Sequence, residues 1–517
     1  MREAAQRDEE GDMSQTSSTL EHTASTQVEH FDVLIVGAGI SGVGAAYHLQ
    51  DQYPEKSFVV LEKFESFGGT WLTHKYPGIR SDSDLYTFGY RFKPWVDKPI
   101  ATADKILAYM GEVIDENDLD RHIRYHHAIS SAEWSSDTSL WTVHATRTDP
   151  DAGTSEALTF TTNFLWMCQG YYKHEQGYTP DWPGMDTYEG QIVHPQTWPT
   201  DIDLAGKQVV VIGSGATAAT LVPAIAGECE HVTMLQRSPT YFVSRPNVNE
   251  VADMLRSLEI PEEWTHEIVR RKALQDQAMI TQLSFDEPEW LRTELLNAVR
   301  AELPEGYDVD THFTPKYRPW QQRLAMVPDG DLFKGISAGL ASVVTDEIET
   351  FNQSGILLKS GQQLDADVIV TATGFDLSVL GDIQFTVDGS PVNFADTVTY
   401  RGMMFTGVPN LLWVFGYFRA SWTLRADLLG DFVCRLLHHM DAKGVRKVVP
   451  ELRDEDADME LGSWIDPENF NPGYLTRSQH LMPKSGNKPE WQHTQDYWTE
   501  KTALPAIDLD DGCLVYD

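Results

Sequence analysis

The chain has 517 residues, of which 41% are hydrophobic and 11% aromatic, so it can form roughly two to four domains with large cores. It carries 78 Asp and Glu against 40 Lys and Arg, a formal net charge of −38. We therefore expect no nucleic-acid partner and no anionic membrane partner, because phosphates would meet a repulsive field. A bound dinucleotide would have to be held locally, by helix N-termini, backbone N–H groups and single arginines.

Cysteine usage and hydropathy indicate a cytoplasmic protein. The four cysteines are scattered without a C-x-x-C pair, which argues against a zinc ribbon or a redox dithiol and favours reduced thiols. No run of about 18 apolar residues is present, so no membrane span is expected. Residues 1–30 are polar and acidic without an apolar h-region, and we interpret them as a disordered acidic tail. The acid excess also fits a high-salt habitat, which composition alone leaves open.

The first predicted elements form a nucleotide-binding pattern. A β-rich run at 31–36 leads into Gly37-Ala38-Gly39-Ile40-Ser41-Gly42, followed by a helix at 41–50, a strand at 57–61 and the acid Glu62. The glycines of such a turn permit a tight bend and close approach of a pyrophosphate, and the helix N-terminus supplies N–H donors. Glu62, twenty residues after Gly42, can accept hydrogen bonds from ribose hydroxyls. The pattern predicts a dinucleotide site rather than a purely structural turn.

Residues 68–84 have neither a helix nor a strand period. Their aromatic residues argue against disorder, so we interpret the stretch as a functional loop. Trp71 offers a flat face for a ring system. Arg80 and Asp82 can place charges near a cofactor; the alternative for Asp82 is a turn-capping carboxylate.

The next elements complete the first unit. Residues 103–118 are predicted to be helical, and 141–145 and 158–166 to be strands joined by a turn-rich connection at 149–155. The Pro/Gly-rich stretch 177–183 then crosses to a second unit.

Residues 188–199 lie on the path between two glycine-rich turns. The stretch is too rich in Gly, Pro and polar residues for a long helix or a central strand, and we interpret it as a loop or linker. It carries two ring side chains four residues apart, His194 and Trp198, which indicates a joint between nucleotide modules. An ordinary surface loop is the alternative.

The second unit repeats the nucleotide-binding pattern. A strand at 207–212 precedes Gly213-Ser214-Gly215-Ala216-Thr217-Ala218, a helix to about residue 226 and a strand at 232–235. The turn is the accepted G-x-G-x-x-A variant. Where an NAD-binding site has an acid, the chain has Arg237 and Ser238. An Arg there suits a 2′-phosphate and favours NADP(H), and a plain surface Arg is the alternative.

The remaining chain returns to the first unit. Residues 249–302 are charged helix formers broken at Pro261 and Pro288, and we interpret them as an insertion in the second unit. Strands are predicted at 342–345, 355–358 and 366–371, and an apolar run at 411–417 precedes a helix at 424–439. The tail from about residue 449 is irregular, and four aromatic residues anchor it: Trp464, Tyr474, Trp491 and Trp498.

With these residues in place, the chain resembles the type I Baeyer–Villiger monooxygenases, and among them the ethionamide-activating subgroup. The linker fits their signature, an aromatic residue followed by G-x-x-x-H-x-x-x-W-[PD], through Gly190, His194, Trp198 and Pro199; Tyr188 stands where the family usually has Phe. A second signature, G-x-W-x4-[FY]-P-G-x3-D, is met by Gly69, Trp71, Tyr76, Pro77, Gly78 and Asp82. The resemblance covers about residues 31–485.

The resemblance implies an α/β fold with two Rossmann-like dinucleotide-binding domains, for FAD and NADP, the second inserted in the first and carrying a helical insertion. The FAD-binding domain would comprise residues 31–175 and 377–517, the NADP-binding domain 188–248 and 323–376, and the helical insertion 249–322. The chain is expected to be a monomer without bound metal.

Residue roles follow from the same resemblance. FAD would be held by Gly37, Gly39, Ser41, Gly42 and Glu62, with Thr70, Trp71 and Asp82 near the flavin. NADP would be held by Gly213, Ser214, Gly215, Ala216, Thr217, Arg237 and Ser238, with Arg80 and Ser81 near the nicotinamide half. Gly190, His194 and Trp198 would couple the domains. Arg323 and Asp82 would be catalytic, Arg323 by analogy with the family's active-site arginine. Many relatives have Lys before that Arg; here it is Gln322, which softens the expected preference for NADPH.

The reaction implied is insertion of one oxygen atom from O2 next to a ketone carbonyl, through a C4a-peroxyflavin and a Criegee intermediate, to give an ester or lactone. Sulfoxidation is expected as a side activity, with a ketone or sulfide as the small-molecule substrate. The alternative is a flavin-containing or N-hydroxylating monooxygenase acting on nitrogen or sulfur, against which Trp198-Pro199 argues. A disulfide reductase lacks support without a cysteine pair, and a non-catalytic flavin protein remains a further alternative.

Overall fold

The computed structural model describes residues 28–517. Of the tail predicted over 1–30, residues 1–27 lie outside the described part. Glu29 and His30 belong to the first strand, β1 (Glu29–Val36), so the predicted tail extends two residues too far. The reason lies in contacts that are distant in sequence, since the Glu29 carboxylate pairs with Arg124 at 2.7 Å and the backbone of Glu29 and His30 pairs with Phe160 and Thr161.

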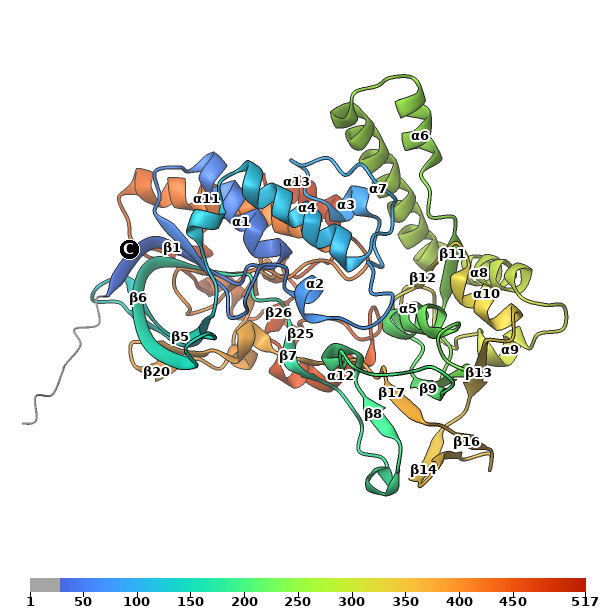
Figure 1. The fold of residues 1–517 in the computed structure, drawn as a ribbon. Coiled ribbons are helices and arrows are strands. Elements are labelled where there is room, and N and C mark those ends of the chain that lie inside the picture. The colour runs from blue at the N-terminus through green and yellow to red at the C-terminus, as the bar shows by residue number, and fades with distance from the viewer. Residues whose placement is uncertain (1–27) are drawn as a thin grey trace, which may run out of the picture.

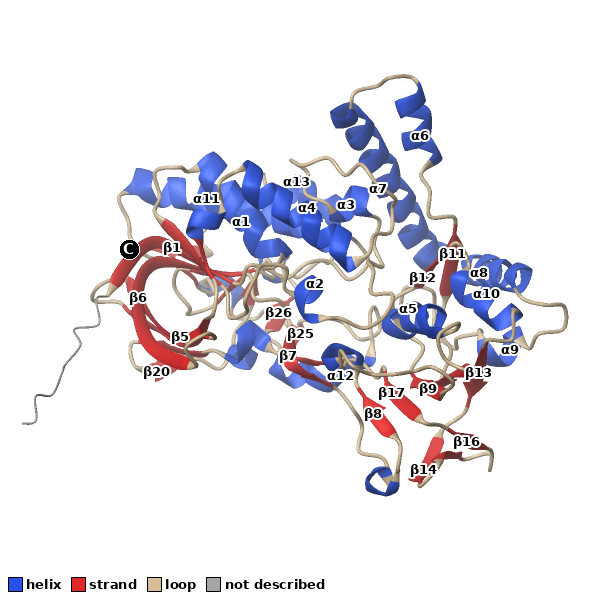
Figure 2. Cartoon of the chain, viewed as in Figure 1, coloured by secondary structure: helices blue, strands red, loops and turns tan. Residues whose placement is uncertain are grey.

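The first unit is built on a nine-stranded sheet in which β1 lies between β2 and β6 (Figure 1). β1 is an apolar run and pairs in parallel with both neighbours, which places Val36 beside Leu61 and Met167. Helices α1, α4 and α11 lie along one side of this sheet (Figure 2). The further strands and the helices of this unit are β2 (Phe58–Leu61), β3 (Ile123–Arg124), β4 (His127–Ser135), β5 (Leu140–Asp149), β6 (Thr154–Met167), β19 (Gln384–Val387), β20 (Ser390–Pro391), β23 (Leu411–Trp413), α1 (Ile40–Gln52), α2 (Thr70–Thr73), α3 (Leu85–Phe88), α4 (Ala103–Glu116) and α11 (Trp422–Lys443).

The second unit contains a five-stranded parallel sheet in the order β13-β10-β9-β17-β8. Its edge strand comes from the stretch interpreted as a linker, where residues 191–193 pair with residues 368–370. A three-residue edge strand needs no long apolar run, which is why the composition favoured a loop. The elements are β8 (Gln191–Val193), β9 (Gln208–Ile212), β10 (His231–Gln236), β13 (Ala341–Thr345), β17 (Val368–Thr371), α5 (Ala216–Ile225) and α10 (Asp331–Ser337), with the small sheets β11 (Phe242–Arg245) and β12 (Ala325–Pro328), and β14 (Ile348–Asn352), β15 (Gly355–Leu358) and β16 (Gln363–Asp365).

A helical arm interrupts the second unit, and its first two helices project beyond it (Figure 1). It comprises α6 (Glu250–Ser257), α7 (Glu262–Asp286), α8 (Pro288–Glu302) and α9 (Val309–His312). Pro261 is the N-cap residue of α7, and Pro288 is the first residue of α8, where the missing N–H of proline has no intrahelical partner to lose. The predicted helix breaks are confirmed.

The chain crosses between the units twice, and the two crossings pair with each other. β7 (Tyr172–Gly177) leaves the first unit, and β18 (Phe375–Leu377) returns to it in an antiparallel pair. The C-terminal tail then forms small elements, within which Trp464 and Trp491 are buried. These elements are β21 (Thr399–Tyr400), β22 (Met404–Phe405), β24 (Val448–Pro450), β25 (Leu461–Ser463), β26 (Lys484–Gly486), β27 (Leu514–Tyr516), α12 (Gly473–Ser478) and α13 (Tyr497–Ala503). Within residues 28–517, no helix combines the length and apolarity that crossing a membrane requires.

Candidate active site

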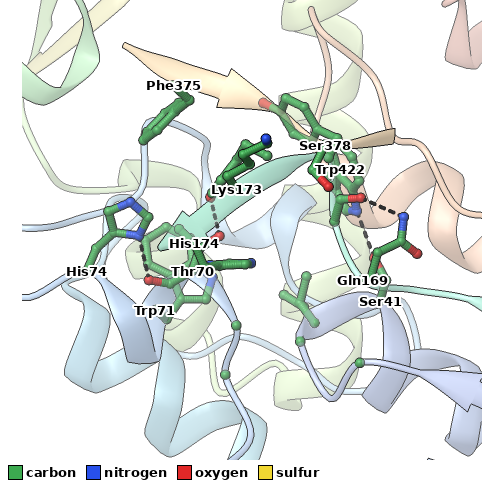
Figure 3. A pocket seen from close by; sticks show the side chains of 18 of the residues that line it. Ser41, Thr70, Trp71, His74, Gln169, Lys173, His174, Phe375, Ser378 and Trp422 are labelled. Carbon is green, nitrogen blue, oxygen red and sulfur yellow. Dashed lines mark hydrogen bonds between the residues drawn. The ribbon is translucent and has the colours of Figure 1, made fainter. Parts of the chain in front are cut away.

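A cavity of about 630 Å³ is lined by residues of both units and reaches both glycine-rich turns. Gly37, Gly39 and Ser41 line it from the first unit, and Gly215 and Thr217 from the second. The turns predicted separately from sequence therefore open onto one shared space. Figure 3 shows part of this lining, with the Trp422 indole directed at Ser41.

The first turn has the geometry of a dinucleotide cradle. Gly37 has φ +94°, and a Cβ on Gly42 would lie 1.8 Å from the Gly37 carbonyl oxygen, so neither position admits a side chain. Gly39 precedes α1 without a side-chain cap, which leaves the first N–H groups of the helix available. A Cβ on Gly39 would meet only the Gly69 Cα, at 3.7 Å. This open, uncapped helix end fits a pyrophosphate.

Glu62 is buried at the carboxyl end of β2 and faces the same turn. Its carboxylate accepts hydrogen bonds from the Ala38 N–H at 2.7 Å and the Phe64 N–H at 3.0 Å. Burial raises the pKa of Glu62, and these two N–H donors act in the opposite direction. Each oxygen retains a lone pair for a ribose hydroxyl. The hydrogen bonds from the Ala38 and Phe64 N–H groups also brace the turn.

Thr70 and Trp71 belong to the short helix α2 and both line the cavity. The Thr70 hydroxyl is hydrogen-bonded to the Tyr172 hydroxyl. The Trp71 ring packs edge-on against Phe88 at 5.8 Å between centroids. The His74 ring lies beside Thr70 (Figure 3), and its buried Nε2 has no hydrogen-bond partner among the described residues.

The second turn is open toward the cavity at its centre. Gly213 has φ +132°, and a Cβ there would lie 2.3 Å from the Ala372 carbonyl oxygen. Gly215, the uncapped residue before α5, has no atom within 4 Å of a Cβ position. Gly215, Ala216 and Thr217 line the cavity, so this turn also fits a nucleotide phosphate.

Four predicted NADP ligands lie outside the cavity lining: Gly213, Ser214, Arg237 and Ser238. The Ser214 hydroxyl donates to the Ser238 carbonyl at 3.2 Å and thereby ties the turn to the end of β10. Arg237 and Ser238 are exposed there. A role for Arg237 toward a ribose phosphate stays a prediction.

Arg323 and Asp82 meet in the cavity across 241 residues of sequence. Arg323 Nη1 donates to Asp82 Oδ2 at 2.9 Å, and the two side chains are 32% and 31% exposed, toward the cavity that they line. Burial lowers the pKa of the guanidinium, but the negative charge of Asp82 more than offsets this and, with the Tyr474 hydroxyl as a polar neighbour, holds the pKa above its ordinary value. Arg323 is therefore a permanent positive charge in the cavity.

Arg80 and Ser81 also line the cavity. Arg80 pairs with the Asp331 carboxylate through both terminal nitrogens, which fixes the loop to the start of α10 in the second unit. The Ser81 hydroxyl donates to the Ser83 carbonyl at 2.8 Å. Both side chains thus hold the loop that carries Asp82.

The linker residues lie outside the cavity, and His194 reaches the two crossings. The His194 ring covers Gly177, where a Cβ would lie 1.8 Å from the ring. His194 Nδ1 accepts from the Gln196 N–H at 3.1 Å, which leaves Nε2–H to donate to the Gly374 carbonyl at 3.3 Å. Trp198 packs against the core of the second unit.

Gly190 is required by the same segment, because a Cβ there would lie 2.2 Å from the Tyr188 hydroxyl. That hydroxyl donates to the Ala366 carbonyl at 2.9 Å, a bond that Phe at this position would lack. The geometry of the linker supports coupling of the units rather than chemistry.

Sequence reasoning missed several cavity residues. Tyr171, Tyr474 and Trp422 line the cavity, and Asp331 holds Arg80. Trp422 stands at the start of α11, two residues before the predicted helix, and its Nε1 donates to Ser41 Oγ at 2.7 Å. An indole just ahead of an apolar helix was the only available signal. The sequence predicts Tyr474 to anchor the tail and gives no sign that it lines the cavity.

Comparison with known proteins decides the family. The sequence pattern described as flavin-binding monooxygenase-like matches residues 97–380, more than half of the chain, and that of an NAD(P)-binding Rossmann-like domain matches residues 35–94. The FAD-containing monooxygenase EthA of Mycolicibacterium smegmatis is 47% identical over 488 residues, which cover 94% of this chain and 97% of that relative. The chain belongs to the flavin-binding monooxygenase-like family. The resemblance drawn from the sequence is thereby confirmed, as is the prediction of a flavin with a nicotinamide nucleotide at the level of this family.

Solved structures place this flavin-binding monooxygenase-like chain in a known fold. A steroid monooxygenase bound to NADP superposes with a TM-score of 0.72 at 21% identity, over 94% of this chain and 99% of that one. The polycyclic ketone monooxygenase of Thermothelomyces thermophila gives 0.75 at 15% identity, over 95% and 90%. At these identities the likeness concerns the fold, and it confirms the predicted α/β architecture with Rossmann-like units.

Proposed function

We propose that this protein is an NADPH- and O2-dependent Baeyer–Villiger monooxygenase, which inserts one oxygen atom next to a ketone carbonyl to give an ester or lactone. The observation that carries the proposal is the Arg323–Asp82 pair, which lies in one cavity with both glycine-rich turns. A permanent charge at that position suits a reaction in which negative charge develops on oxygen.

The residues present fit two dinucleotides. The turn at Gly37–Gly42 with Glu62 would hold FAD, and Thr70 and Trp71 would lie near the flavin ring. The turn at Gly213–Ala218 with Arg237 and Ser238 would hold NADPH. Bound FAD, reduced by NADPH, would supply the activation of O2. All other contributions come from the chain itself.

Arg323 contributes the charge, and Asp82 orients it. The guanidinium presents N–H donors toward the cavity, where they would stabilise the oxyanion formed when the ketone carbonyl is attacked. Asp82 occupies one edge of the guanidinium and limits its rotation. Because the pKa of Arg323 is raised, the residue keeps its proton throughout and acts electrostatically rather than as an acid.

Replacement of Arg323 tests the proposal. Arg323→Ala should retain flavin reduction by NADPH but lose about 10²–10³ in the rate of ester formation, the effect of removing one oxyanion donor. Arg323→Lys keeps the charge without the paired N–H edge, so its rate of ester formation should lie between those of the parent and of Arg323→Ala. Stopped-flow absorbance measures reduction, and chromatography measures ester. Ester at the parent rate from the Ala variant would show that Arg323 is not the oxyanion donor.

The substrate class is tested in the same assay by offering ketones and sulfides side by side. Baeyer–Villiger activity predicts ester from ketones, with sulfoxide as an additional product. Sulfoxide or N-oxide with no ester from any ketone would instead support the flavin-containing monooxygenase alternative.

A further inference from the structure

The hydroxyl of Tyr474 is buried and has no hydrogen-bond partner among residues 28–517. An unpaired buried hydroxyl is unfavourable and calls for a partner in some state of the protein. Tyr474 lines the cavity and lies close enough to Arg323 to affect its pKa. Within the described residues, Arg323 makes one hydrogen bond, to Asp82, whereas a guanidinium has five N–H groups. A free acceptor thus stands beside a group with free donors.

Tyr474 differs from the second phenol near Arg323 in how it is held. Tyr171 stacks on Trp422, with centroids 5.2 Å apart and an interplanar angle of 15°, and Trp422 is fixed in turn by Ser41. Tyr474 is carried by α12, a helix of six residues in the tail. Its position depends on what holds that short helix.

Arg477 holds α12 to both crossings between the units. It lies one turn after Tyr474 on the same side of the helix. Its guanidinium sits over the Tyr178 ring, 3.5 Å from the centroid, and Nη2 donates to the Phe375 carbonyl at 3.2 Å. Tyr178 directly follows the outgoing strand β7, and Phe375 begins the returning strand β18.

The domain-coupling linker reaches the same place. The Gly374 carbonyl accepts from the Tyr178 N–H at 3.0 Å and from His194 at 3.3 Å. A Cβ on Gly374 would lie 3.8 Å from Arg477 Nη2. His194 and Arg477 therefore contact one small region of the crossings, the first from the linker and the second from the tail.

We propose that Tyr474 is a positioning residue for Arg323, and that Arg477 links it to the crossings through α12. Asp82 holds one edge of the guanidinium, and the Tyr474 oxygen accepts from another, so that the two fix its plane. A shift of the second unit about the crossings moves Arg477, and α12 carries that shift to Tyr474. The activity readouts of this inference rest on the proposed function, whereas the readout in the cofactor-free protein does not.

The first test is Tyr474→Phe, which removes only the hydroxyl. With a ketone that the parent converts, the ester formed per NADPH consumed should fall about tenfold, the usual effect of one lost hydrogen bond. Flavin reduction by NADPH and the KM for ketone should stay within twofold of the parent. Tyr497→Phe, on α13 outside the cavity of the site, is the matched control and should form as much ester per NADPH as the parent. Unchanged ester yield in Tyr474→Phe would overturn the role of the hydroxyl.

The second test is Arg477→Ala, read first in the cofactor-free protein by hydrogen exchange. Amides of residues 473–481 should exchange faster than in the parent, and Tyr474→Phe should leave them unchanged. In the ester assay, the variant that combines Tyr474→Phe with Arg477→Ala should form as much ester per NADPH as Tyr474→Phe alone, because both changes act on the same chain of contacts. Parent-like exchange in Arg477→Ala, or additive losses in the double variant, would overturn the link. If the parent makes no ester from any ketone, the proposed function fails, and the exchange experiment still decides the link.

Discussion

Arg323 owes its properties to neighbours that are distant in sequence. The carboxylate of Asp82 and the phenols of Tyr171 and Tyr474 surround it, and burial raises the pKa of both phenols, so they remain neutral. Asp82 supplies the negative charge that pairs with Arg323, and the neutral phenols add none. Such an arrangement stabilises developing charge on a substrate oxygen without a proton transfer from the arginine.

We propose that Arg237 sets the preference for NADPH over NADH. Arg237→Ala should raise the KM for NADPH about tenfold or more and leave the KM for NADH nearly unchanged, because only NADPH carries the 2′-phosphate. Initial rates of nucleotide oxidation with each cofactor measure this. Arg237→Lys, which retains a charge, should lie near the parent. Equal changes for both nucleotides would contradict the assignment.

Single residues of the site were predictable where they sit in a motif. The glycine turns, Glu62, Asp82 and Arg80 follow fixed spacings, and the structure brings all of them to or beside the cavity. Asp331 and Tyr474 have no such spacing; each reaches the site only because a separate element packs there. For this reason sequence reasoning gave Arg80 a ligand role and could not see its partner at residue 331.

Among the elements, the short helix α3 connects the site loop to the helical arm. Asp84 caps it by accepting from the Tyr86 N–H at 2.9 Å. At its other end, Arg270 of α7 donates to the carbonyls of Tyr86, Thr87 and Gly89. The loop that carries Asp82 is thus braced just downstream by a buried cation of the arm.

The cap of α3 yields a pH prediction. Burial raises the pKa of Asp84 from 3.8 to about 6, partly offset by the Tyr86 N–H. Because the folded pKa is the higher one, the stability contributed by Asp84 is full below the unfolded pKa and falls as pH rises to about 6, by on the order of 3 kcal/mol. Asp84→Asn keeps a good cap without the charge. The variant should match the parent near pH 4 and melt at a higher temperature at pH 8; a difference independent of pH would contradict this.

The elements that flank the two glycine-rich turns could be predicted because their signals are local, whereas β4 (His127–Ser135) was missed. Strand runs end at glycine turns, and Pro261 and Pro288 divide the arm where the helices begin. The edge strand β8 could not be predicted, because three residues are too few to show an alternating pattern. It is defined by its pairing with β17. Sheet order and the pairing of the two crossings likewise depend on contacts between segments that are distant in sequence.

For the molecule as a whole, the crossings hold the two units together alongside the Arg80–Asp331 and Arg323–Asp82 pairs. Gly177→Ala should disturb the crossings, since the new Cβ would occupy the place of the His194 ring. We expect a loss of about 1–3 kcal/mol in the free energy of unfolding, measured by denaturant titration, together with fewer ester molecules per NADPH. Gly227→Ala, exposed and with no atom within 4 Å of its Cβ, is the matched control. Equal stability of both variants would show that the contact is dispensable.

The most direct measurement of the central claim follows the oxygen atom. The holoenzyme is supplied with NADPH, a cyclic ketone and ¹⁸O2, and the product is analysed by mass spectrometry. The account predicts a lactone that carries one ¹⁸O in the ring and one NADPH consumed per lactone. Consumption of NADPH with hydrogen peroxide as the only product, and no labelled lactone from any ketone, would contradict it.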